Sequence, residues 1–114
     1  MVNEKKTDII VAQMLSEVGI NFTPNGSNVE EVNNALASSS KRGTGRKGFP
    51  EFVAMSNGFV IVIEDKANVF QQARYMDDQA ETLLMDIPSI CDYAENGAVH
   101  YAQNIIAKTT FKKV

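Results

Sequence analysis

The stretch that decides the fold is PEFVAMSNGFVIVIEDK, residues 50–66. Two runs suited to β-strands, 50–55 and 59–63, lie on either side of the turn formers Ser56-Asn57-Gly58. Two such runs joined by a short turn predict a β-hairpin, so we expect these strands to pair. Residues 59–63 are apolar on both faces and rich in β-branched side chains, which predicts the central strand of a sheet.

Helical periodicity on both sides of the hairpin predicts the elements that cover the sheet. Residues 5–18 repeat apolar side chains at i, i+3, i+4 and i+7. We expect the buried face of this helix to carry Val11, Met14, Leu15 and Val18, with Ile10 on its flank. The capping-box spacing of Ser27 and Glu30 predicts a second helix over about 28–38. Similar spacing predicts helices over 69–85, ended by Pro88, and over about 97–107.

The expected architecture is α/β, with a small mixed β-sheet centred on the hairpin and flanked by helices. Residues 109–114 resemble the start of another strand, after which the chain stops. We therefore expect residues 1–114 to form a single domain that is a fragment of a longer polypeptide. A sheet edge left open in this way would favour self-association.

Composition places the chain among ordinary globular proteins. Hydrophobic residues make up 44% and charged residues 22%, and the formal charge of −3 does not by itself indicate a nucleic-acid binder. Cys91 is the only cysteine, so no internal disulfide can form and a reducing compartment is expected. No apolar run approaches the roughly 20 residues that cross a bilayer, and residues 1–6 lack the apolar centre of a secretion signal. We expect a cytoplasmic protein without a membrane partner.

Two acids and a lysine occur where the strand pattern does not call for them. Because side chains alternate along a strand, Glu64 and Lys66 are expected on one face and Asp65 on the other, at the surface. The hairpin brings Glu51 toward Glu64. Neighbouring carboxylates suit Mg²⁺, or Mn²⁺ in its place, and Lys66 can orient water or stabilise charge on a phosphate. This pattern predicts hydrolysis of a phosphodiester.

The run Pro50-Glu51 … Glu64-Asp65-Lys66 resembles the PD-(D/E)xK nuclease signature, with glutamate replacing the usual aspartate after proline. Residues 41–67 are similar to the N-terminal nuclease region of type I-like and fused restriction–modification proteins. The resemblance implies a restriction-endonuclease-like core that cleaves double-stranded DNA, with Glu51 and Glu64 as metal ligands and Lys66 as catalytic lysine. It also implies methyltransferase, specificity or translocase domains in the same or a partner chain.

The same resemblance names accessory residues. Relatives often carry a further acid on the first helix, for which Glu17 is the candidate here. Many also carry a Gln-x-x-x-Tyr element, whereas Tyr101 and Gln103 lack that spacing. Tyr101 is otherwise expected to fill the core, and the lone histidine, His100, to lie at the surface.

The loop over residues 38–48 combines three glycines and four basic residues with no acid. Such a composition predicts a mobile, cationic loop whose side chains contact DNA phosphates. The candidate contacts are Lys41, Arg42, Arg46 and Lys47. The alternative is a solvated loop without a ligand.

Other functions remain compatible with these residues. The acids and lysine could form a surface ion pair on a sheet edge, which contributes little. The domain could be a structure-specific repair or junction-resolving nuclease, a catalytically inactive module that binds DNA or a partner subunit, or a protein-interaction domain. Divalent-cation affinity and salt-dependent DNA binding separate these alternatives.

Overall fold

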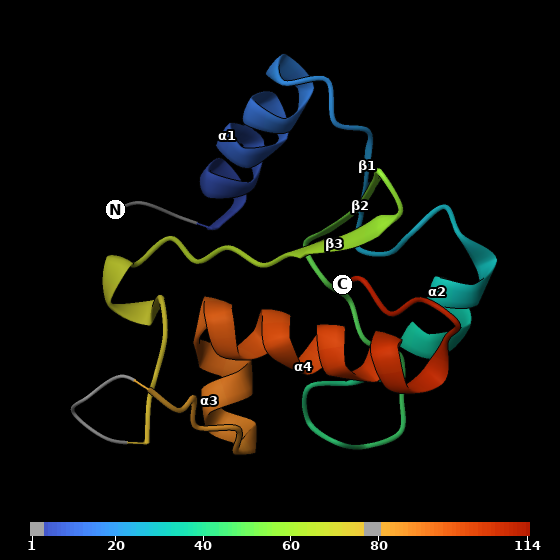
Figure 1. Ribbon diagram of the computed structural model, residues 1–114. Coiled ribbons are helices and arrows are strands. Elements are labelled where there is room, and N and C mark those ends of the chain that lie inside the picture. The colour runs from blue at the N-terminus through green and yellow to red at the C-terminus, as the bar shows by residue number, and fades with distance from the viewer. Residues whose placement is uncertain (1–3, 77–80) are drawn as a thin grey trace.

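The computed structural model of the protein describes residues 4–76 and 81–114 (Figure 1). Its elements are α1 (Glu4–Glu17), β1 (Phe22–Pro24), α2 (Glu30–Leu36), β2 (Phe52–Ser56), β3 (Phe59–Ile63), the 3₁₀ turn η1 (Val69–Gln71), α3 (Ile87–Asp92) and α4 (Ala94–Lys108). This arrangement confirms the expected α/β class. In Figure 1 the sheet lies between α1 on one side and α4 on the other.

The predicted hairpin is confirmed. Strands β2 and β3 pair antiparallel in a register that sets Ser56 opposite Phe59. Asn57 and Gly58 connect them with φ angles of 51° and 80°. Both central residues of a two-residue hairpin turn need positive φ for the turn to follow the strand twist, and Asn-Gly adopts this conformation at little cost. Local turn chemistry therefore determines the register of the hairpin.

The sheet differs from the prediction in its order and strand direction. The strand order is β1-β2-β3 and both pairings are antiparallel, so β2 is central and the predictions of a mixed sheet and a central 59–63 strand are wrong for the described residues. Strand β1 is only three residues long and lies in a stretch of turn formers, which concealed it. Along the outer edge of β3, the Val60 N–H donates to the Lys113 carbonyl over 2.8 Å. The C-terminal segment thus runs beside β3 without forming a strand.

The core lies between the sheet and the helices α2 and α4. Its buried members are Val32, Leu36, Val53, Val60, Tyr101 and Ile105. The α4 helix confirms the prediction over 97–107, although it starts at Ala94. The buried positions Tyr101 and Ile105 are four residues apart, so α4 turns one face toward the core.

The first helix forms as predicted, but two of the four residues of its predicted buried face are exposed. Met14 and Val18 are 60% and 69% exposed, and Ile10 on the flank is 50% exposed. Helical spacing identifies an apolar face, but a partner for that face must come from elsewhere in the fold.

None of the helices among the described residues has both the length and the apolar character needed to span a bilayer.

Two other helix predictions need correction. In the predicted helix over 69–85, residues 77–80 lie outside the described residues, and the described parts hold only η1 and an isolated bridge between Tyr75 and Leu83. Pro88 lies in the first turn of α3 instead of ending a helix, because proline lacks only an N–H that is unused there.

The helix predicted over about 28–38 is shorter, and its start differs. The expected capping box does not form, because α2 begins after Val29. The Ser27 hydroxyl accepts a hydrogen bond from the Val29 N–H instead, and the Asn33 amide bonds the Ser27 backbone.

Candidate metal centre

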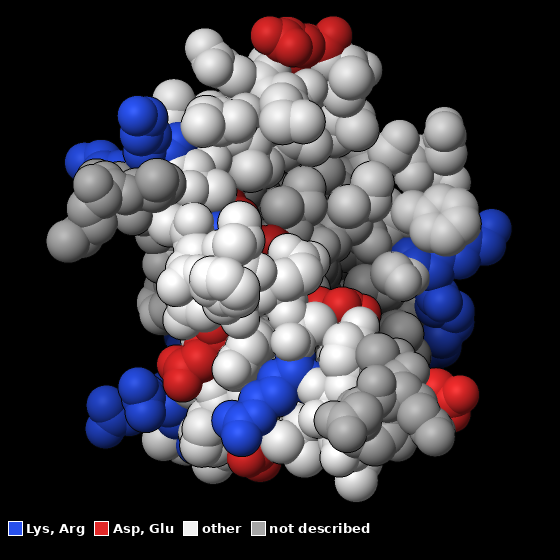
Figure 2. All heavy atoms as spheres, turned by 90° about the vertical axis from the view of Figure 1, so that its left-hand side faces the viewer, with Lys and Arg blue, Asp and Glu red and all other residues white. Residues whose placement is uncertain are grey.

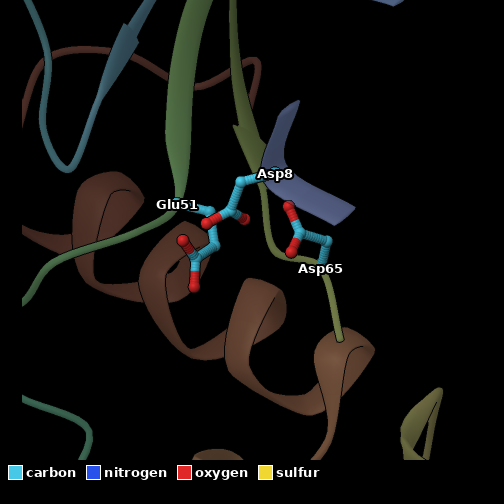
Figure 3. Close-up of side chains that lie close together, drawn as sticks. All are labelled: Asp8, Glu51 and Asp65. Carbon is cyan, nitrogen blue, oxygen red and sulfur yellow. The ribbon is translucent and has the colours of Figure 1, made fainter. Parts of the chain in front are cut away.

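Three carboxylates from distant parts of the chain meet beside the hairpin. Oxygen atoms of Asp8, Glu51 and Asp65 all lie within 4.8 Å of one another. Figure 3 shows their side chains pointing toward one another. Asp8 belongs to α1, Glu51 immediately precedes β2, and Asp65 follows the end of β3. The cluster therefore depends on the hairpin and on the docking of α1.

Asp65 was expected at the surface, and the structure shows this to be wrong. Asp65 is 8% exposed, and its carboxylate is part of the acidic cluster. The expectation extended strand alternation through residues 64–66, but β3 ends at Ile63. Beyond that point the backbone is irregular, so side chains need not alternate between two faces of the sheet.

Asp8 was not identified from the sequence. It precedes Val11 and Leu15 by three and seven residues, so it extends a partly buried stripe of the helix. The sequence feature that could have identified Asp8 is the position of an acid on the partly buried face of the helix. The predicted accessory acid, Glu17, is instead exposed at the last position of α1. It is nine positions from Asp8, a rise of about 14 Å along the helix.

Glu64 contacts Glu51 through the backbone. Its Oε1 accepts a hydrogen bond of 2.9 Å from the Glu51 N–H, and its Oε2 lies 2.6 Å from Lys41 Nζ. The Glu64 side chain is 1% exposed and that of Lys41 is 17% exposed. The structure therefore brings Glu64 next to Glu51, with one of its oxygens on the Glu51 backbone N–H and the other on Lys41. Lys41 belongs to this ion pair instead of extending from a mobile loop.

Lys66 immediately follows Asp65 in the chain. Its Nζ donates a hydrogen bond of 3.2 Å to the Cys91 carbonyl, at the end of α3. The residue is half-buried. This contact anchors the lysine between the segment that follows β3 and the α3 helix.

The donor set of the cluster fits a hard divalent cation. All three groups supply carboxylate oxygens, which Mg²⁺ and Mn²⁺ prefer. Carboxylates this close repel one another unless a proton or a cation intervenes. In addition, Asp8 Oδ1 is buried and accepts no hydrogen bond from the described residues. A buried acceptor of this kind is costly unless a cation or water satisfies it.

Tyr101 fills the core, as the sequence indicated, and also supports the segment before Glu51. It is 2% exposed, and its hydroxyl accepts a hydrogen bond of 3.0 Å from the Phe49 N–H. Burial raises the pKa of Tyr101 to about 12, while the hydrogen bond from Phe49 acts in the opposite direction and the charge of Glu64 adds to the rise. Tyr101 is thus a neutral structural group at ordinary pH.

Gln103, the last candidate on α4, is exposed. The lone histidine, His100, is half-buried, and its Nε2 lies 2.9 Å from the Ser39 carbonyl oxygen. Helical rotation separates these positions from the Tyr101 face.

The basic loop is folded against the domain. Gly43 and Gly45 adopt φ angles of 68° and 73°, and the Ser40 N–H donates to the Arg46 carbonyl. A surface pocket of about 640 Å³ results, which we call the cationic pocket; it is lined by Ser40, Arg42, Thr44, Arg46, Lys47 and Phe49. Figure 2 shows acidic atoms recessed in the hollowed middle of one face of the molecule, with basic side chains standing out around them.

Comparison with known proteins gives a match along the whole chain. It is 37% identical over 117 aligned residues to the Type II restriction enzyme and methyltransferase RM.BcgI of Heyndrickxia coagulans. The alignment covers 100% of this chain and 18% of that relative, so the chain spans about a fifth of the relative's length. No family model and no solved structure matches. The chain is therefore similar, over its full length, to one part of a restriction and modification enzyme.

Proposed function

We propose that this chain is the metal-dependent nuclease part of a restriction–modification enzyme and hydrolyses phosphodiester bonds of DNA. The observation that carries this proposal is the meeting of Asp8, Glu51 and Asp65 within 4.8 Å at the end of the hairpin. The similarity to a restriction enzyme and methyltransferase supports a DNA substrate and methyltransferase partners. The exposed Arg42, Arg46 and Lys47 supply cations for the phosphate backbone.

Each residue of the centre has a proposed role. Asp8, Glu51 and Asp65 hold a divalent cation, Mg²⁺ in the cell, with Mn²⁺ able to replace it. Such an ion polarises a phosphodiester and lowers the pKa of water. Lys66, next in the chain to Asp65, orients the attacking water or stabilises charge that develops on the phosphate.

The roles of Glu64 and Asp65 differ from those that the nuclease signature implies. The signature makes Glu64 the metal ligand, but its two oxygens already bind Lys41 and the Glu51 N–H. Asp65 has its carboxylate in the acidic cluster. We therefore assign the ligand role to Asp65 and a positioning role to Glu64, which holds the backbone that carries Glu51.

The fold supports the same proposal. An antiparallel hairpin carries Glu51 before its first strand and Asp65 after its second, with helices on both sides of the sheet. A restriction-endonuclease-like core has its acids at such a position, and we propose that this domain is a small member of that architecture. In this proposal the function lies in the clustered acids, and the fold itself only holds them in place.

Cleavage by the full-length gene product tests the assignment. Plasmid DNA is incubated with Mg²⁺ and the wild-type protein, or with Glu51→Gln, Asp65→Asn or Lys66→Ala variants. We expect each variant to cut at least about 100-fold more slowly, because each removes a ligand or an electrostatic contact in the transition state. Glu30→Gln, at an exposed position of α2, is the matched control and should cut normally.

Two outcomes would contradict the proposal. Normal cutting by Asp65→Asn together with inactivity of Glu64→Gln would transfer the ligand role to Glu64. Calorimetry with Mn²⁺ provides a readout that does not depend on cleavage. No heat of Mn²⁺ binding, combined with intact DNA affinity, would identify a catalytically inactive DNA-binding module instead.

A further inference from the structure

Phe49 is an exposed aromatic residue on a backbone that is held in place on both sides. Phe49 is 57% exposed, whereas both of its neighbours in the chain, Gly48 and Pro50, are buried. The Phe49 N–H donates to the buried Tyr101 hydroxyl, and the Gly48 N–H donates over 2.8 Å to the Leu36 carbonyl. The exposure of the ring therefore follows from a fixed backbone, not from a loosely attached loop.

The close packing at Gly48 shows how rigid this support is. A Cβ atom built on Gly48 would lie 2.5 Å from Tyr101 Cε1 and 2.6 Å from the Ser39 carbonyl oxygen. No side chain fits between these atoms, so the backbone before Phe49 rests directly on α4 and on the end of the segment after α2. A shift of the backbone that leads into Phe49 would have to break this contact.

The surroundings of the ring are cationic. Phe49 is the one large apolar residue in the cationic pocket, whose charged lining consists of Arg42, Arg46 and Lys47 without an acid. Lys47 Nζ lies 5.2 Å from the centre of the Phe49 ring. The three cations favour an anionic ligand, and a nucleotide offers a phosphate for them and a flat base for the ring.

The position along the chain links this surface to the acidic cluster. Phe49 precedes Glu51 by two residues, so their Cα atoms are at most about 7 Å apart. We propose that Phe49 stacks on a DNA base adjacent to the phosphate that is cut, while Arg42, Arg46 and Lys47 hold the flanking phosphates. This inference rests on the proposed nuclease function and adds that the substrate is unstacked at one base beside the scissile bond.

Stacking needs an aromatic face, so the matched substitution is Phe49→Leu, which keeps apolar volume and removes the ring. Binding of the full-length gene product to a duplex with a mapped cut position is measured with Ca²⁺ replacing Mg²⁺, and cleavage is measured with Mg²⁺. We expect about a ten-fold loss of affinity or cleavage rate in Phe49→Leu, the size typical of one stacked base. Phe49→Tyr, which retains the ring, should recover most of this loss.

Phe59 provides a control of the same kind. It is 48% exposed and also lies under a lysine, with Lys113 Nζ 5.7 Å from its ring centre, but it is at the turn end of the hairpin. Phe59→Leu should leave DNA binding and cleavage unchanged. Unfolding temperatures of both leucine variants equal to that of the wild type exclude a folding defect.

A second DNA substrate, with a mismatch beside the cut, distinguishes stacking of Phe49 on a base from a contact that does not involve unstacking. A mismatched base pair beside the cut lowers the cost of unstacking that base. It should therefore reduce the difference in cleavage between Phe49→Leu and the wild type. Equal loss on matched and mismatched DNA would overturn the stacking role, and so would wild-type behaviour of Phe49→Leu.

Failure of the inference and failure of the proposed nuclease function give different results. If Phe49→Leu behaves as wild type while Asp65→Asn loses Mn²⁺ binding and cleavage, only the inference fails. If the wild-type protein neither binds Mn²⁺ nor cuts DNA, the nuclease function fails and the stacking role with it. Loss of binding to a partner protein, with DNA binding intact, would identify the pocket as a protein contact instead.

Discussion

Lys41 Nζ lies 2.6 Å from Glu64 Oε2, in an ion pair whose side chains are 17% and 1% exposed. The other Glu64 oxygen accepts the Glu51 N–H, so the pair is connected to the backbone of the acidic cluster. Lys41 also lies 5.5 Å from the centre of the Tyr101 ring. A basic loop residue is thus part of the support of the site, at the point where the loop meets α4.

Removing the cation of this pair should destabilise the chain. Lys41→Met leaves the buried Glu64 carboxylate without its counter-ion, which costs about 3 kcal/mol of unfolding free energy. Urea unfolding of the 114-residue chain measures this loss. The double variant Lys41→Met, Glu64→Gln should recover part of it, because no buried charge remains. An unfolding free energy of Lys41→Met within about 0.5 kcal/mol of wild type would show that the pair is solvated.

The acidic cluster should destabilise the metal-free chain and stabilise the metal-bound one. Asp8→Asn relieves carboxylate repulsion, so we expect a higher unfolding temperature than wild type in EDTA. With excess Mn²⁺ the order should reverse, because ligand binding to the folded state raises stability and the variant has lost a ligand. Glu17→Gln, on the same helix but exposed, should follow the wild type in both buffers. An equal Mn²⁺-induced shift in Asp8→Asn would remove Asp8 from the site.

The close approach at Gly48 should make it intolerant of any side chain. Gly48→Ala places a methyl group 2.5 Å from the Tyr101 ring and 2.6 Å from a backbone carbonyl, so the backbone must shift. We expect a loss of about 2 kcal/mol or more in unfolding free energy, the range of overpacked cores. Gly26→Ala is the comparison, because its Cβ would meet Asn33 Oδ1 at 3.4 Å, and it should change stability by less than about 0.5 kcal/mol. Similar values for the two variants would contradict the tight contact.

Tyr101 should make stability depend on alkaline pH. Its pKa rises from 10.0 to about 12 in the folded chain, so the neutral form is favoured by folding. The associated stabilisation is fully present below pH 10 and is lost as pH rises toward 12. Tyr101→Phe should lose about 1 kcal/mol at pH 7, because the Phe49 N–H loses its acceptor, and should show a shallower decline above pH 10. Parallel pH profiles of the two proteins, measured by urea unfolding, would refute this role.

Local sequence was sufficient wherever the structure depends on neighbours in the chain. The Asn57-Gly58 turn determines the hairpin, since its φ angles are those that this dipeptide adopts readily. The α4 helix follows from its own apolar spacing, and so does the burial of Tyr101. The same reasoning placed Glu51 at the start of the hairpin and acids at its other end.

Only the tertiary structure decided which acids meet. Asp65 turns inward because β3 ends at Ile63, and Glu64 is drawn to Lys41 and the Glu51 backbone. Asp8 joins the cluster through the docking of α1, a contact between segments more than 40 residues apart in the sequence. Side-chain periodicity extends only as far as a regular element does, and beyond its end packing and charge pairing determine direction. For that reason the sequence determined the hairpin and its chemistry, whereas the fold selected the members of the site.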